Sequence, residues 1–327
     1  MIDFRYHLVS IIAVFLALAV GLAVGSTALT GTAEQALTAA QHRLTGQNKS
    51  LTKQNGIYQK QVAGDQAFAE ANSARLLAGL LTGEHVVLIA APGADSAVTS
   101  GLTTALREAG ATVTGQVTLQ STFTTTSGQN EAKLSQLATN LADSAGLTLA
   151  AVPNSTVSGQ QQAARVLAAG LLSGAALTIT ASQAVLTGFS QAGFITVDSG
   201  APASVPADLA VLVTPAGPPT QQGMSEVLMA VVQELKSAGR ATVMAGAMSS
   251  IGSGSPISAE NSAGPTVSTV DNADTEIGQI LVVQALRFLL DGKGPAAYGA
   301  EPAAAPSPGP TPSVAATPKP SSSVKGH

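Results

Sequence analysis

The sequence predicts an α/β protein with a single N-terminal transmembrane helix, a helical stalk, a mainly parallel sheet domain with helices on both faces, and a disordered C-terminal tail. Three observations predict this arrangement. An uninterrupted apolar run lies near the N-terminus, apolar strand-like segments alternate with helical ones between residues 83 and 299, and seven prolines lie between residues 301 and 327. The expected parts are therefore 1–31, 32–82, 83–299 and 300–327.

The amino-acid composition excludes several classes of protein and of site. Of 327 residues, 45% are hydrophobic and only 10% are charged, whereas ordinary soluble domains carry about 25% charged residues. A net charge of −4 with 15 basic residues gives no electrostatic footprint for a nucleic-acid partner. The chain has no cysteine, which excludes disulfides, thiolate metal sites and cysteine nucleophiles.

The N-terminal segment predicts a membrane anchor. Residues 6–33 contain no charged side chain, and the run from Leu8 to Leu29 would span about 33 Å as a helix. Arg5 precedes the run and Arg43 is the first basic residue after it, so the positive-inside rule places the N-terminus in the cytoplasm and the main domain outside. The alternative is a signal peptide cleaved near Ser26, which would release the protein toward the outer membrane or cell envelope.

Residues 32–80 are expected to form one long helix, because they lack proline and are rich in good helix formers. An apolar stripe recurs every seven residues, at Leu37, Leu44, Leu51 and Tyr58. If this stripe is heptad position d, position a holds Gln41, Asn48 and Asn55, a polar composition that sets register in a weak coiled coil. Two interpretations remain open: a stalk that forms a homodimer, or a monomeric helix that lies on the following domain.

The α/β pattern follows from strands buried on both faces and helices of 12–18 residues between them, which favour right-handed crossovers. The expected strands are 85–91, 111–117, 176–180, 194–197, 209–215, 241–247 and 267–270. The expected helices are 95–109, 131–142, 158–172, 221–238 and 274–291, and residues 249–265 are expected to be a long loop. The tail is too rich in proline and small residues to bury a core.

Two polar segments are candidates for chemistry. The densest acidic cluster, Asp271, Asn272, Asp274 and Glu276, could hold a hard cation or could cap a helix that starts near residue 274. The turn at residues 92–96 could face an anion, but it lacks the lysine and the glycines of nucleotide-binding motifs, so Asp95 or Ser96 is expected to cap a helix. The segment 188–193 lacks the preceding strand of a nucleophile elbow. No catalytic residue and no cofactor is expected.

Several segments carry a family resemblance. The opening His7-Leu8-Val9-Ser10 with residues 13–26, together with 110–119, 267–286 and Tyr298-Gly299, resembles the actinobacterial MctB-type copper transport (outer membrane) protein family. The resemblance implies copper export or tolerance at the cell envelope, and the family name implies an outer-membrane channel. The α/β pattern and only ten aromatic residues are not typical of a barrel with aromatic girdles, so an inner-membrane anchor is favoured.

Copper as a transported ion calls for soft or imidazole ligands. The candidates are Met224, Met229, Met244, Met248, His7, His42, His85 and His327. Their spacing does not converge on one site, and methionine commonly fills gaps in a core, so the metal ligands are not assigned.

Three functions remain in view. The first is a non-enzymatic, membrane-anchored copper-homeostasis protein. The second is a structural or scaffold protein of the envelope that dimerises through residues 32–80. The third is an enzyme with a pocket at the carboxyl ends of the parallel strands.

Overall fold

The computed structural model describes residues 4–149, 158–175, 177–198, 205–219 and 221–300. The chain divides into two units, Met1–Asp65 and Gln66–His327. The predicted tail, 300–327, lies outside the described residues except for Ala300, and so does His327.

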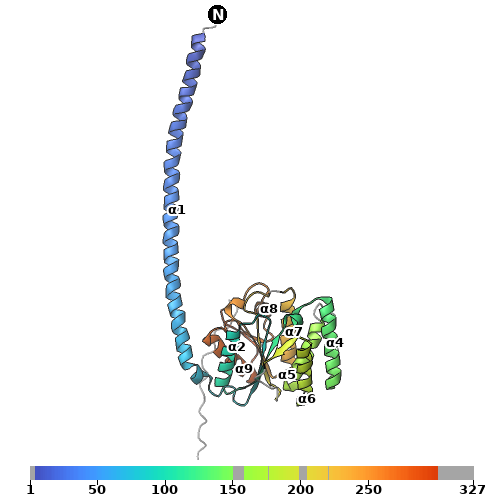
Figure 1. Cartoon of the computed structure of the whole chain (residues 1–327). Helices are drawn as coiled ribbons and strands as arrows, with labels where there is room; N and C mark the ends of the chain where they lie inside the picture. The colour runs from blue at the N-terminus through green and yellow to red at the C-terminus, as the bar shows by residue number, and fades with distance from the viewer. Residues whose placement is uncertain (1–3, 150–157, 176, 199–204, 220, 301–327) are drawn as a thin grey trace, which may run out of the picture. The chain divides into compact units, whose positions relative to one another are not determined.

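The first helix unites the predicted anchor and stalk. Helix α1 runs without interruption from Phe4 to Leu77, a total of 74 residues, as Figure 1 traces in blue. Its segment Tyr6–Gly25 is 20 residues long with a mean hydropathy of 2.7, and none of it is buried. This helix is therefore long and apolar enough to cross a bilayer, as the sequence predicts.

A seven-stranded sheet forms the centre of the second unit. The strand order is β3-β2-β1-β4-β5-β6-β7, and all neighbours pair in parallel except β2 and β3. Its members are β1 (His85–Ala90), β2 (Thr112–Leu119), β3 (Ile195–Val197), β4 (Leu209–Val213), β5 (Ala241–Ala245), β6 (Ser268–Val270) and β7 (Ala297–Tyr298). The chain leaves β1 toward β2 and later returns to its other side with β4, so the topological switch point lies between β1 and β4.

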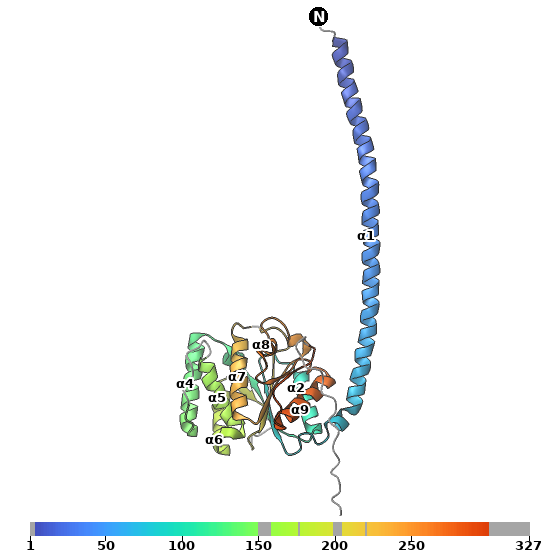
Figure 2. The same ribbon diagram turned by 180° about the vertical axis from the view of Figure 1, so that it is seen from behind.

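Helices cover both faces of the sheet, which confirms the predicted class (Figures 1 and 2). One face carries α4 (Gly128–Ala145), α5 (Ser158–Leu171), α6 (Ile179–Gln191) and α7 (Met224–Ala238). The other face carries α2 (Ser96–Glu108) and α9 (Glu276–Leu290). Two short helices, α3 (Ser121–Thr124) and α8 (Pro256–Ala263), follow β2 and β5.

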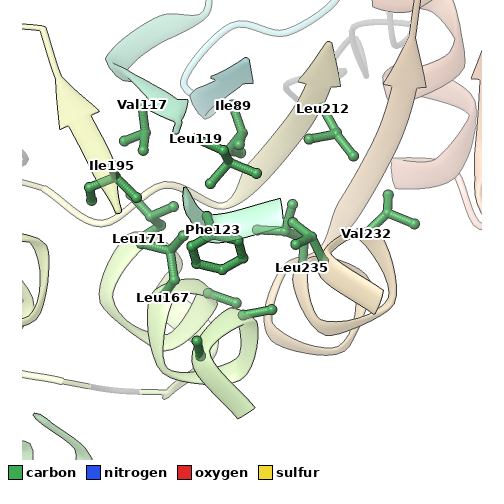
Figure 3. Close-up of a cluster of buried hydrophobic side chains, with 14 of the residues drawn as sticks. Ile89, Val117, Leu119, Phe123, Leu167, Leu171, Ile195, Leu212, Val232 and Leu235 are labelled. Atoms are coloured by element: carbon green, nitrogen blue, oxygen red, sulfur yellow. The ribbon is translucent and has the colours of Figure 1, made fainter. Parts of the chain in front are cut away.

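The central strands contribute side chains to two separate hydrophobic cores, because successive side chains of a strand point to opposite faces of the sheet. In β1, Val87 and Ile89 belong to the core with α4–α7, while Val86 and Leu88 belong to the core with α2 and α9. Figure 3 shows the Phe123 ring of α3 within the first core, among side chains from strands and from α5 and α7.

The last turns of α1 are part of the second core. Ala69 and Leu77 are buried, the Ser73 hydroxyl donates to Glu108 Oε2 at 3.1 Å, and Gln66 Oε1 accepts from the Glu276 backbone N–H at 3.1 Å. One of the two interpretations of residues 32–80 was a helix that lies on the following domain. Residues 66–77 pack in this way.

Two segment predictions are wrong. Residues 176–180 were expected as a strand, but the Thr178 side chain accepts from Ala181 N and caps α6, which begins at Ile179. Residues 249–265 were expected as a loop, but Ser255 caps α8 and Pro256 occupies its first turn. In both places residues typical of strands or loops serve a helix start, where serine, threonine and proline are favoured.

Candidate functional site

The methionine and histidine candidates for copper are spread over several elements. Met224 and Met244 are buried in the first core, and Met229 packs against it from α7. Met248 is exposed in a 3-10 turn after β5. These positions give the buried methionines a packing role, as expected for a flexible apolar side chain.

The histidines are equally dispersed. His7 and His42 are exposed on α1, and His85 begins β1, where its Nδ1 lies 3.5 Å from Asp208 Oδ2. Within the part of the chain that the structure describes, no three His, Asp or Glu side chains gather as a metal site would require. The described candidates therefore form no common copper site within one copy of the chain.

The acidic cluster binds backbone groups. Asp271, fully buried at the end of β6, accepts from Ala300 N at 2.7 Å. Asp274 Oδ1 accepts from Met248 N at 3.1 Å, and the Thr275 hydroxyl accepts from Gly278 N at 3.0 Å. Helix α9 starts at Glu276, two residues later than expected, because Thr275 is its cap. This geometry supports the capping interpretation over a hard-cation site.

The turn after β1 is likewise structural. Asp95 caps α2 by accepting from Ala97 N at 2.8 Å, as the sequence predicts. Gly93, at φ 79°, accepts from Ala216 N at 2.9 Å, and the Ser249 hydroxyl donates to the Ala216 carbonyl. These contacts join the loops after β1, β4 and β5, at the switch point where related sheets commonly hold a ligand.

A cavity of about 260 Å³ lies near the amino ends of the strands, at the edge opposite the loops just described. It is lined by α5, α7 and residues 147–149. Glu234 in its wall is 9% exposed and accepts from Arg165 Nε at 3.0 Å, Arg165 Nη2 at 3.1 Å and Gln161 Nε2 at 3.0 Å. The hydrogen bond that Arg165 donates to Glu234 raises the pKa of the Arg165 guanidinium above its ordinary value. Sequence reasoning missed this pair, because 69 residues separate its members.

A second, larger hollow of about 590 Å³ lies between α7 and α8. Serines supply most of its polar lining, and they already bind nearby backbone: the Ser225 hydroxyl donates to the Gly254 carbonyl, and Ser258 Oγ accepts from Gly252 N at 3.1 Å. The hydroxyls thus hold the 251–255 loop between the two helices. Met229 is the single thioether in this lining.

The exposed apolar stripe of α1 is the remaining candidate surface. Leu37, Leu44, Leu51 and Tyr58 are 71%, 57%, 55% and 63% exposed. An apolar row of this length on a helix surface is typical of an interaction face.

Comparison with known proteins covers nearly the whole chain. The family model described as "Copper transport outer membrane protein, MctB" matches residues 1–308. "Copper transporter MctB" of Mycobacterium tuberculosis (strain ATCC 25618 / H37Rv) and that of Mycobacterium bovis are each 30% identical over 312 aligned residues, covering 91% of this chain and 96% of the relative. The Mycobacterium leprae protein of the same name is 29% identical with the same coverage.

Proposed function

Because the chain belongs to the MctB family of copper transport proteins, which functions in copper homeostasis, we propose that it acts in copper export or tolerance without catalysing a reaction. The observation that carries the proposal is the family match over residues 1–308, which takes in the apolar span as well as the α/β domain. The protein is membrane-associated and its family is named for the outer membrane.

The proposed topology is a retained, single-pass anchor in the cell membrane. Residues 1–31 form a cytoplasmic stub and the anchor, 32–82 the stalk, 83–299 an extracytoplasmic α/β domain, and 300–327 a tail. The apolar span Tyr6–Gly25 and the order of Arg5 and Arg43 support this orientation. Cleavage near Ser26 and transfer to the outer membrane is the competing outcome. Sequencing the N-terminus of the mature protein in each membrane fraction distinguishes the two.

A non-catalytic role is supported by the polar groups at the carboxyl ends of the strands. The Thr214 and Ser250 hydroxyls donate to the carbonyls of Ala245 and Ala247, and the acidic side chains there accept from backbone N–H groups. Groups bound in this way support the loops, whereas a nucleophile or a general base needs a partner that activates it.

Copper tolerance tests the proposal directly. A clean deletion is expected to make growth copper-sensitive and to raise cellular copper, and the intact gene restores both. Unchanged tolerance together with unchanged cellular copper would overturn it. Replacing Met229 and Met248 with leucine, which keeps volume and removes the thioethers, then asks whether these donors take part.

The exposed stripe of α1 favours a second candidate function, a structural or scaffold protein that dimerises through residues 32–80. In this role a second copy covers the leucine row. Cross-linking through cysteines placed at Leu37, Leu44 and Leu51 is expected to give a covalent dimer in membranes. A strictly monomeric product at all three positions rejects the dimer.

A further inference from the structure

The stretch of α1 from residue 37 to residue 62 keeps charge away from one side of the helix. With the apolar stripe as heptad position d, positions a, d, e and g lie on or beside that stripe. They are occupied by Leu37, Thr38, Ala40, Gln41, Leu44, Thr45, Gln47, Asn48, Leu51, Thr52, Gln54, Asn55, Tyr58, Gln59, Gln61 and Val62, none of which is charged. We call this set the neutral seam.

All the charges of this stretch lie on the opposite side. Arg43, Lys49, Lys53 and Lys60 occupy positions b, c and f, and no acidic residue occurs between Glu34 and Asp65. The glycines at 46 and 56 also fall at f and b, so the seam itself contains no gap. A helix solvated on every side has no reason to confine its lysines in this way, whereas a helix that buries one side does.

We infer that the occupant of the neutral seam is a second copy of this chain, parallel and in register. The inference rests on the stalk dimer proposed above and names its geometry. Two copies anchored through Tyr6–Gly25 enter the same bilayer in the same direction, so their helices run parallel. In register, each leucine layer meets itself across a two-fold axis, and the area it covers is apolar.

The amide layers favour this geometry. Each side chain of Asn48 and Asn55 carries both a donor and an acceptor, so an in-register pair can satisfy itself with its own counterpart. Any shift by one heptad would also align amides, but a shift by three or four residues would place amides against leucines. Asparagine at position a further selects two strands over three.

The seam has a structural end. Val62, at position a, is the last residue of the seam. The d position after it is Asp65, where two like charges would face each other, and the a position after it is Ala69, which is buried in its own second core. The pairing therefore covers residues 37–62, about 39 Å of helix at 1.5 Å per residue. Because no charged side chain lies in the seam, no ion pair across it contributes to pairing, and salt only screens the repulsion between the basic side chains outside it.

Single cysteines test the geometry cleanly, because the chain has no native cysteine. Full-length Leu44→Cys, Asn48→Cys and Leu51→Cys are oxidised in native membranes beside the outer-face controls Lys49→Cys and Lys53→Cys. The seam positions are expected to give about tenfold more disulfide-linked dimer than the controls. The yield is expected not to fall between about 50 and 500 mM salt, because screening weakens the repulsion between the basic side chains of the two copies.

The outcomes separate the two proposals. No dimer at any position rejects the stalk dimer and the inference together. Dimer formed equally at Lys49 and Lys53, or a yield that falls with salt, leaves the dimer standing and rejects the neutral seam. In a second variant, Asn48→Leu with Asn55→Leu in the cysteine-free chain, cross-linking through lysines with a bifunctional amine-reactive reagent is expected to give trimers and larger species; an unchanged dimer would show that the amides do not select two strands.

Discussion

Gly278 offers the sharpest test of the fold, because helix propensity and packing predict opposite signs for its replacement by alanine. Gly278 is the third residue of α9, where alanine would ordinarily stabilise a helix by about 1 kcal/mol. A Cβ at this position would overlap the Asn272 carbonyl oxygen, a backbone atom that also accepts from Thr275 N at 3.0 Å and from the Thr275 hydroxyl at 2.8 Å.

The expected magnitude follows from these contacts. Overpacking against backbone costs up to about 3 kcal/mol, and disturbing the Thr275 cap costs about 1 kcal/mol more. The gain in helix propensity offsets about 1 kcal/mol, which leaves Gly278→Ala about 3 kcal/mol less stable. For a domain of this size the Tm falls by about 6–12 °C, measured by circular dichroism on the detergent-solubilised full chain.

Gly101→Ala is the matched control. Gly101 also lies inside a helix, α2, but its Cβ would meet only the end of the flexible Gln279 side chain. We expect its Tm to stay unchanged or to rise by up to about 4 °C. If Gly278→Ala raised the Tm as Gly101→Ala does, the close approach of α9 to the loop after β6 would be refuted.

Three further predictions concern the stability of the same domain. Phe123→Ala should lower the free energy of unfolding by about 4 kcal/mol in urea, because the ring is fully buried and 6.4 Å from Phe189; Phe123→Leu should lose about 1 kcal/mol. Glu260→Ala should lose about 3 kcal/mol, because this buried carboxylate accepts from Thr266 and from Val267 N at 2.9 Å; Glu260→Gln keeps an oxygen there and should lose about 1 kcal/mol, and equal losses would contradict this role. Burial raises the pKa of Tyr298, so its contribution is fully present below about pH 10 and is lost as pH rises further. Tyr298→Phe should therefore flatten the alkaline fall of Tm, and an unchanged profile would assign that fall to other groups.

The sequence predicted those parts of the fold that show as a continuous pattern of residue types along the chain. Runs such as 209–215 are apolar at every position because both faces of β4 are covered, and the charge-free run before residue 34 marks the apolar helix. The helix start at Asp95 follows from capping chemistry.

The misses have equally definite causes. The segment 176–180 has the β-branched residues of a strand, yet the Thr178 cap commits it to α6. Strand β7 is two residues long and carries no periodicity at all.

In the candidate sites, too, the sequence predicted contacts between near neighbours in the chain but not contacts between distant residues. Asp95 as a cap was predictable from its position, whereas the Arg165–Glu234 pair and the close approach at Gly278 depend on residues brought together only by folding. Met244 and Met248 have helical spacing but lie on β5 and in the turn after it, and the burial of Met224 and Met244 in the first core is consistent with a packing role.

Transmembrane orientation is the claim on which the proposed function depends. Alkaline phosphatase, active only after export, and a fluorescent protein that matures only in the cytosol are each fused after Gly299 in the full chain. The account predicts phosphatase activity from the first fusion and no fluorescence from the second. Fluorescence without phosphatase activity would place the α/β domain in the cytosol and contradict the account.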